Sequence, residues 1–265
     1  MFLFITGLIL TVVFFIYVLG NKKRIVNKFR NKIKIMKQGG NGLGVDMIYC
    51  ISMPDRIEHA KKKMKEIGGN YKLIDAVKPT DLSPIDYCTA SLTYFTGAHM
   101  FAKRTKLPVA LSFYMCYNDA LENGYETICI FEDDVIFPKG VSAIKKAVNE
   151  FKHTDFEVFY MGYFGLTCNN YYQRISEGLV DVTERALVGN HGLCMKLTFL
   201  EKYLASPFLF YATFNDVTLN KFCIINGIKV CVPNEALVDQ DRKKFGTNND
   251  SFAMDIPTCN FNDNV

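Results

Sequence analysis

The sequence predicts one α/β domain that follows an N-terminal membrane helix. Strand-like and helix-like patterns alternate from residue 46 onward, which is typical of an α/β fold. The chain has 265 residues, of which 49% are hydrophobic, enough to form a packed core. We therefore divide it into an anchor at 1–20, a basic, glycine-rich linker at 21–45 and a domain at 46–265.

Residues 2–19 form an uncharged run, FLFITGLILTVVFFIYVL. As a helix this run would rise about 27 Å, close to the thickness of the bilayer core. No basic segment precedes it and no small-residue cleavage site follows it, which disfavours a signal peptide; a buried core helix is the other alternative. Cations flank it only on the C-terminal side, so we expect them to lie against anionic lipids, with the domain cytosolic rather than luminal.

The basic residues are concentrated ahead of the domain. Residues 21–45 hold eight lysines and arginines and no acid, whereas the whole chain has a net charge of +4, so the remainder carries 4 − 8 = −4. A mildly acidic domain does not suit nucleic-acid binding. Residues 39–44, GGNGLG, precede the first strand and lack the dinucleotide-binding spacing, so we expect a flexible hinge there.

The domain opens with a β–α unit. Residues 45–51 have the pattern of a strand, and apolar residues at helical spacing predict a helix from Ile57 to Ile67, ended by two glycines. Ser52 and Asp55 have the spacing of a capping box at the start of this helix.

Further strands and a helix follow. We expect a strand over residues 71–77, a helix over 110–122 and a strand at 126–131, ETICIF. The last is a continuous apolar run, typical of a strand buried on both faces of a parallel sheet. In open α/β sheets, ligands bind beyond the carboxyl ends of such strands.

Three adjacent carboxylates, Glu132, Asp133 and Asp134, follow this strand; we call them the acid triplet. Each negative charge raises the cost of ionising its neighbours, unless the group is well solvated or a cation compensates it. Carboxylate oxygens suit Mg²⁺ or Mn²⁺, which keep coordination sites free for diphosphate oxygens. The triplet therefore predicts a metal site, with a solvated turn as the alternative.

The nine cysteines are odd in number and include no C-x-x-C pair. This pattern indicates neither a zinc site nor a full disulfide framework. Cys50 and Cys129 lie within strand-like apolar runs, so we expect them to be buried free thiols. Free thiols favour a reducing compartment, in agreement with a cytosolic domain.

Six segments between residues 46 and 241 carry a resemblance to a known family. They are YCISMPDRIEHAKKKM, IDAVKPTDL, LSFYMCYNDALENGYETICIFEDDV, FEVFYMGY, GNHGLCMKLTFLEKYL and FNDVTLNKFCIINGIKVCVPNEALVDQD. In content, order and spacing they resemble glycosyltransferase family 25, the enzymes of lipopolysaccharide and collagen glycosylation. The chain departs from the family pattern where Phe113, rather than histidine, follows Ser112, and where Leu193 replaces an aromatic residue.

The resemblance implies a GT-A fold and an inverting transfer of a hexose, galactose or glucose, from a UDP-sugar to a hydroxyl of a glycan, glycolipid or protein. It also implies that the acid triplet binds Mn²⁺ or Mg²⁺, with Asp134 as the first choice of direct ligand, and that Asp216 is the general base. The residues implied at the donor are Arg56, Ala76, Val77, Lys78, Asp133 and His191.

Each of these residues also has an ordinary structural interpretation. Arg56 could be a surface charge, His191 could occupy a polar turn, and Asp216 could cap a helix. Two other functional classes also remain open. A catalytically silent nucleotide-sugar-binding relative is favoured by the missing Ser-His pair, whereas a metal-dependent phosphotransferase or nuclease is disfavoured by the acidity of the domain.

Overall fold

The computed structural model describes residues 24, 27–38, 42–84, 86, 106–164, 172–206 and 215–246. The predicted anchor, residues 2–19, lies outside these residues. Within the described part of the chain, no helix combines the length and the apolar character needed to cross a membrane.

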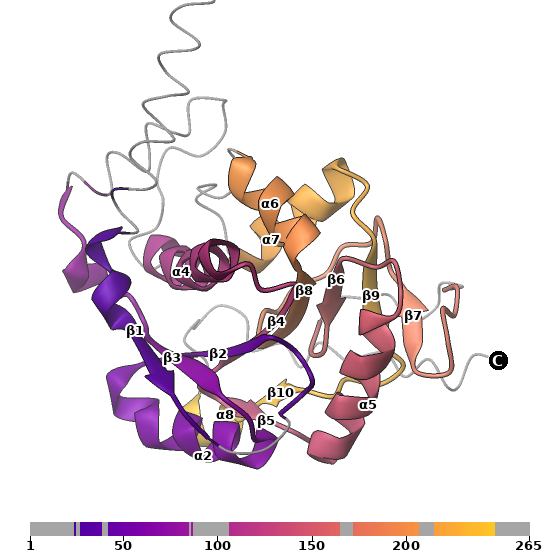
Figure 1. The fold of residues 1–265 in the computed structure, drawn as a ribbon, viewed down its shortest axis with the longest axis horizontal. Helices are drawn as coiled ribbons and strands as arrows, with labels where there is room; N and C mark the ends of the chain where they lie inside the picture. The colour runs from indigo at the N-terminus through magenta and orange to yellow at the C-terminus, as the bar shows by residue number, and fades with distance from the viewer. Residues whose placement is uncertain are drawn as a thin grey trace, which may run out of the picture.

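A mixed sheet of eight strands forms the centre of the molecule, in the order β1-β3-β2-β4-β8-β6-β9-β7 (Figure 1). The strands are β1 (Ile33–Met36), β2 (Met47–Ser52), β3 (Tyr71–Asp75), β4 (Thr127–Glu132), β6 (Val158–Tyr160), β7 (Leu179–Asp181), β8 (Gly192–Lys196) and β9 (Val230–Pro233). A second, two-stranded sheet consists of β5 (Val135–Ile136) and β10 (Asp239–Gln240).

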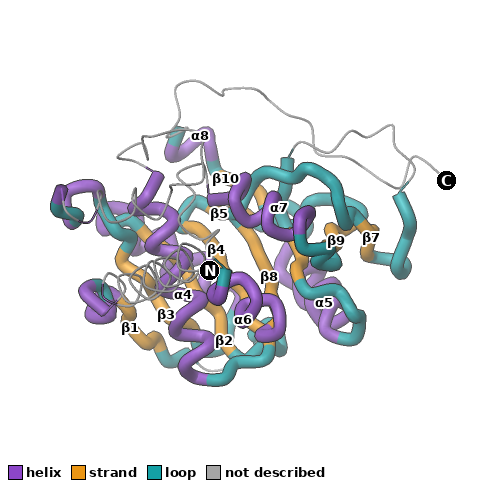
Figure 2. Tube along the Cα trace, turned by 90° about the horizontal axis from the view of Figure 1, so that it is seen from above, coloured by secondary structure: helices purple, strands orange, loops and turns teal. Residues whose placement is uncertain are grey.

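Helices cover both faces of the main sheet, as Figures 1 and 2 show. The helices are η1 (Arg30–Lys32), η2 (Pro54–Arg56), α2 (Ile57–Ile67), η3 (Pro79–Asp81), α4 (Lys106–Asn123), α5 (Gly140–Lys152), α6 (Leu197–Ala205), α7 (Asn215–Ile225) and α8 (Arg242–Phe245). Helices α4, α6 and α7 pack on one face, and α2 and α5 pack on the other.

Strand β4 confirms the predicted strand that is buried on both faces. Ile128 and Ile130 belong to the hydrophobic cluster on one face, while Cys129 and Phe131 belong to the cluster on the other, and all four are 0% exposed. Because side chains alternate along a strand, a strand covered by helices on both sides needs an unbroken apolar run. Cys50 and Cys129 are buried free thiols, as predicted.

The first β–α unit also agrees with the sequence, except at its capping residue. Helix α2 runs from Ile57 to Ile67 as expected and ends at Gly68, which has a positive φ of 78°. The expected capping box is wrong, because Ser52 Oγ instead donates to the Met53 carbonyl at 2.9 Å. A turn of 3₁₀ helix beginning at Pro54 leads into α2, since proline has the φ that a first helical turn requires.

The carboxyl ends of β2, β3 and β4 meet at one edge of the sheet. These three strands are parallel, and their register places Ser52 opposite Asp75 and Ile51 opposite Glu132. Strand β8 lies between β4 and β6 and is antiparallel to both, so the sheet is mixed. The acid triplet therefore lies at the edge where the sequence placed it.

The basic segment, expected to be a linker, contributes a strand to the domain. Residues 33–36 form β1, an edge strand that pairs antiparallel with β3. Leu43, in the expected hinge, is 3% exposed and belongs to the core beside α2. The ordered domain thus begins before residue 46, because a non-local strand partner and a core contact recruit residues of the basic segment.

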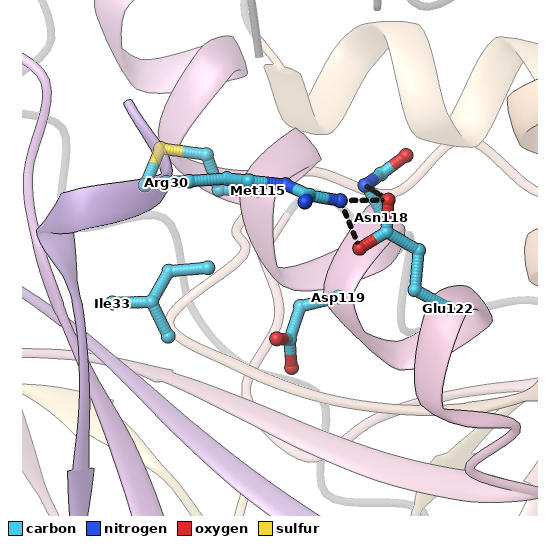
Figure 3. Close-up of a pocket in the computed structure, with 6 residues that line it drawn as sticks. All are labelled: Arg30, Ile33, Met115, Asn118, Asp119 and Glu122. Atoms are coloured by element: carbon cyan, nitrogen blue, oxygen red, sulfur yellow. Dashed lines mark hydrogen bonds and ion pairs between the residues drawn. The ribbon is translucent and has the colours of Figure 1, made fainter. Parts of the chain in front are cut away.

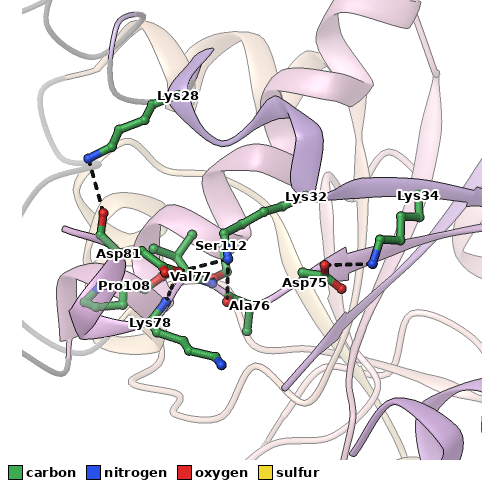
Figure 4. Close-up of polar contacts among 10 residues, drawn as sticks. All are labelled: Lys28, Lys32, Lys34, Asp75, Ala76, Val77, Lys78, Asp81, Pro108 and Ser112. Atoms are coloured by element: carbon green, nitrogen blue, oxygen red, sulfur yellow. Dashed lines mark hydrogen bonds and ion pairs between the residues drawn. The ribbon is translucent and has the colours of Figure 1, made fainter. Parts of the chain in front are cut away.

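Four cations of this segment form ion pairs with acids of the domain. The pairs are Lys28–Asp86 at 2.7 Å, Arg30–Glu122, Lys32–Asp81 at 2.9 Å and Lys34–Asp75 at 2.8 Å (Figure 4 shows the Lys34 pair). Exposed pairs contribute little individually. Together with the β1–β3 pairing, they hold this segment on the domain.

Candidate active site

The backbone of the acid triplet is held by segments that are distant in the sequence. Glu132 ends β4, and its N–H donates to the carbonyl of His191 at 3.4 Å. The N–H of Asp241 donates to the carbonyl of Asp134 at 2.7 Å. Strand β10 also pairs with β5, directly after the triplet, so the turn is fixed on both sides.

Asp133 is bound by the residues that lead into α2. Its Oδ2 accepts the Met53 N–H at 2.6 Å, and its Oδ1 lies 3.4 Å from Arg56 Nη1. The same Arg56 nitrogen lies 3.8 Å from Asp134 Oδ2. Arg56 is therefore a partner of the triplet and not an isolated surface charge.

The protein stabilises the ionised forms of Glu132 and Asp134 only in part. Burial and the charges of Asp134, Asp133 and Asp216 raise the pKa of Glu132 to about 8, although Gln240 Nε2 donates to its Oε2 at 3.2 Å. Burial and Asp133 raise the pKa of Asp134 to about 6, against the opposing effect of Arg56. Among the described residues, the buried Asp134 Oδ1 has no hydrogen-bond partner.

These two carboxylates fit a divalent cation. Glu132 and Asp134 offer hard oxygen donors, and a cation would relieve their repulsion and pair with the Asp134 Oδ1 atom. The described part of the chain contains no cluster of three His, Cys, Asp or Glu side chains that could hold a metal by itself. Mg²⁺ sites at phosphates commonly use one or two carboxylates plus substrate oxygens, so two ligands suffice.

The segment Ala76–Val77–Lys78 follows β3 at the same edge (Figure 4). Ala76 and Val77 are buried, with 8% and 4% exposure. The Val77 N–H donates to Ser112 Oγ at 2.9 Å, and this hydroxyl donates to the Pro108 carbonyl at 2.9 Å. Ser112 on α4 therefore fixes the segment. Its three N–H groups are bonded within the protein, to Ser52, Ser112 and Asp81, so it can offer a ligand carbonyl oxygens and the Lys78 side chain.

The two departures from the family pattern lie in the hydrophobic core. Phe113 is 1% exposed and belongs to the cluster that covers one face of the sheet. Leu193, 0% exposed, lies in β8 opposite Ile130 and Tyr160. Both side chains therefore pack in the core, where neither contacts the acid triplet directly in the strand register or the core cluster.

His191, expected at the donor, lies inside the protein. Its side chain is 1% exposed and packs closely against Gly162 and Gly189. Burial lowers its pKa to about 4, against the opposing charge of Asp239, so the ring is neutral at neutral pH. Its contribution to the site is the carbonyl that accepts the Glu132 N–H.

We expect Gly162→Ala to destabilise the protein by about 1–3 kcal/mol, the usual cost of overpacking. A Cβ at this position would collide with His191 Nε2 and with the Val238 carbonyl, and the carbonyl cannot rotate away. Thermal unfolding would measure the loss. Gly178→Ala is the matched control, because its added Cβ meets only the flexible Glu150 side chain. Equal unfolding temperatures for both variants would contradict this packing.

Asp216 lies at the start of α7 and near the triplet. Its Oδ2 accepts the Gly189 N–H at 2.9 Å, and its Oδ1 accepts the Val217 N–H at 2.9 Å. Gly189 lies two residues before His191, whose carbonyl accepts the Glu132 N–H, so this bond joins Asp216 to the segment beside the triplet. Asp181, another acid downstream of the triplet, lies in β7, at the far edge of the sheet.

Comparison with known families agrees with this geometry. The family model described as glycosyltransferase family 25 (LPS biosynthesis protein) matches residues 46–177. Residues 46–177 belong to glycosyltransferase family 25. The resemblance noted in the sequence is thereby confirmed, and membership supports a glycosyltransferase.

Comparisons beyond the family 25 match add little. No curated protein matches the chain. Among solved structures, the crystal structure of A197 from STIV is 16% identical and has a TM-score of 0.30, covering 59% of this chain and 67% of that one. A TM-score this low supports no argument about fold or function.

Two residues at the candidate site were missed by sequence reasoning. Gln240 contacts Glu132, and it lies in the segment LVDQD, whose resemblance to the family was the available signal. Phe245 stacks on Arg56, with 4.7 Å between the guanidinium carbon and the ring centroid. A lone aromatic residue after Arg-Lys-Lys offers no signal in the sequence.

A cavity of about 210 Å³ lies apart from the triplet, between the basic segment and α4. It is lined by Arg30, Ile33, Met115, Asn118, Asp119 and Glu122 (Figure 3). Its acids already have cationic partners: Asp119 Oδ2 accepts from Lys72 Nζ at 2.6 Å, and Glu122 pairs with Arg30. The cavity therefore shows no charge that a ligand would have to neutralise.

Proposed function

We propose that this protein is a metal-dependent, inverting glycosyltransferase of GT-A type, which moves a hexose from a UDP-sugar to an acceptor hydroxyl. The observation that carries the proposal is the partly compensated acid triplet at the carboxyl edge of three parallel strands, within a family 25 domain. Ligands of open α/β sheets bind at this edge.

We assign the cation to Asp134 and Glu132. A bound Mn²⁺ or Mg²⁺ would neutralise charge on the leaving diphosphate. Asp133 is engaged by Arg56 and Met53, so it orients Arg56 instead of serving as a third ligand. Arg56, whose side chain is 14% exposed, is assigned to the diphosphate, because a guanidinium recognises phosphate oxygens through paired hydrogen bonds.

We assign the nucleoside end of the donor to the segment Ala76–Val77–Lys78. Its position after β3, at the same edge as the triplet, supports this assignment. Because Ala76 and Val77 are buried and the N–H groups of the segment are bonded within the protein, recognition would use its carbonyl oxygens and the Lys78 side chain. We assign His191 to the support of Glu132 and not to donor contact.

We assign the role of general base to Asp216. In an inverting transfer, a base must remove the proton of the acceptor hydroxyl as that oxygen attacks the anomeric carbon. Each Asp216 oxygen accepts one backbone N–H, so each keeps a lone pair that can accept the proton. The same bonds place the carboxylate at the N-terminus of α7, so its capping and catalytic roles are compatible.

A catalytically silent relative is the second candidate function. It is favoured by Phe113, which fills the core where the family has a histidine, while Ser112 accepts the Val77 N–H. The acceptor could be a glycan, a glycolipid or a protein. A membrane anchor at residues 2–19 would place the domain close to lipid-linked acceptors, with membrane lipids as its second partner.

A screen of nucleotide sugars tests the proposed function. The full chain would be incubated with UDP-galactose, UDP-glucose and GDP-sugars, with Mn²⁺ or with EDTA, and release of nucleotide would be measured. We expect release from a UDP-hexose only with the metal. Mn²⁺-dependent UDP binding without hydrolysis or transfer would favour the silent relative, and cleavage of phosphate esters would favour a phosphotransferase.

A further inference from the structure

Residues 239–245, which we call the C-terminal clamp, lie against the acid triplet. They comprise β10, Asp241 and α8, and they lie outside the residues that match family 25. The clamp holds the triplet in three ways. Strand β10 pairs with β5, the Asp241 N–H donates to the Asp134 carbonyl at 2.7 Å, and Gln240 Nε2 donates to Glu132 Oε2. In Figure 2, α8, β10 and β5 lie together at one end of the sheet.

The last residue of the clamp, Phe245, packs on polar residues at the start of α2. Its ring centroid lies 4.7 Å from the Arg56 guanidinium carbon and 4.9 Å from the His59 ring, which meets it edge-on. Lys244, beside it, lies 3.0 Å from His59 Nδ1. Phe245 is only partly buried and belongs to neither hydrophobic cluster, so its packing serves this contact and not the core.

The stacking restricts a side chain that is otherwise flexible. Arginine loses much side-chain conformational entropy when it is ordered. Here Phe245 fixes one face of the guanidinium, and the carboxylates of Asp133 and Asp134 lie at its edge. An arginine that is ordered before the ligand arrives binds more tightly, because less freedom is lost on binding.

We propose that Phe245 is a positioning residue for the donor diphosphate, acting through Arg56. The inference rests on the proposed function, because it takes the diphosphate as the ligand of Arg56. Through Phe245, the clamp becomes part of the donor site, although it lies beyond the residues that match family 25.

The test is a double-mutant cycle on the full chain, with UDP and Mn²⁺ as the probe in calorimetric titrations. Phe245→Leu should weaken UDP binding by about 2- to 12-fold, the cost of ordering one long side chain on binding. Phe245→Tyr, which keeps the aromatic face, should bind nearly as the unchanged chain does. In an Arg56→Gln background, Phe245→Leu should have no further effect, because the group that it positions is gone.

Phe156→Leu is the matched control. The Phe156 ring also contacts a cation, with 5.9 Å from Lys229 Nζ to its centroid. Phe156 precedes β6, so it lies at the opposite end of the sheet from the triplet. It should lower the unfolding temperature without changing UDP affinity. The inference would be overturned if Phe245→Leu bound UDP as tightly as the unchanged chain does. It would also be overturned if Phe245→Leu lost the same affinity with Arg56 present and in the Arg56→Gln background. Absence of UDP binding by the unchanged chain would instead refute the proposed function.

Discussion

Asp216→Asn is expected to lower the rate of sugar transfer by about 10²- to 10⁴-fold, the usual contribution of a general base. The amide has nearly the same shape but cannot accept the proton of an acceptor hydroxyl. Binding of UDP should change little, because the proposed metal and diphosphate ligands are other residues. Initial transfer rates and UDP titrations on the full chain measure the two quantities separately.

The substitution also has a modest structural effect. Asp216 accepts N–H groups from Gly189 and Val217 through different oxygens, and an asparagine has only one oxygen to offer. Losing one such bond costs about 1 kcal/mol, which lowers the unfolding temperature by a few degrees. Asp181→Asn is the control, because Asp181 Oδ1 also accepts a backbone N–H, from Thr183 at 2.8 Å, but at the far edge of the sheet.

The outcomes for Asp216 separate its candidate roles. Normal transfer by Asp216→Asn would leave the residue as a helix cap only. A loss of UDP affinity, with transfer reduced in proportion, would assign Asp216 to the donor or metal site. A rate loss shared by Asp181→Asn would indicate a general effect on stability and would argue against a catalytic base.

Asp134→Asn is expected to weaken Mn²⁺ and UDP binding by at least about 10- to 100-fold, since even substitutions of residues that only orient a metal ligand have effects of this size. The change removes a charged oxygen donor and preserves side-chain volume. The fold should persist, because the Asp241 N–H contacts the main-chain carbonyl of Asp134 and not its side chain. Titration with Mn²⁺, together with transfer assays over a range of Mn²⁺ concentrations, measures the effect.

Asp55→Asn is the matched control for the loss of a negative charge. Asp55 is exposed and close enough to raise the pKa of Asp133, but it contributes no ligand to the proposed site. It should change metal affinity much less than Asp134→Asn does. Equal effects of the two variants would reduce the role of Asp134 to long-range electrostatics, and full activity in EDTA would exclude the metal mechanism.

Local patterns in the sequence were enough to predict the parts of the site that lie on regular elements. The apolar run at 126–131 predicted a strand buried on both faces, and β4 confirms it. Helical spacing predicted α2 to its last residue, and Gly68 ends it as expected. Because parallel strands share one carboxyl edge, these elements together placed the acid triplet at the ligand-binding edge of the sheet.

These local patterns could not predict contacts between segments that are distant in the sequence. Strand β1 depends on β3, about forty residues further on, and the sequence showed only a basic stretch. Gln240 and Phe245 reach the site because β10 pairs with β5, more than a hundred residues earlier in the chain. Short-range periodicity reports which face of an element is buried, but not which remote segment covers it.

The sequence by itself determined the class of the protein, the carboxylates of the site and the edge of the sheet that carries them. Only the tertiary structure decided which of those residues are engaged within the protein and which keep an atom available to a ligand. It binds Asp133 to Arg56 and leaves Asp134 Oδ1 without a partner among the described residues, while it buries His191. The physical reason is that the pKa and the available lone pairs of a side chain depend on burial and on neighbours, which three-dimensional packing alone brings together.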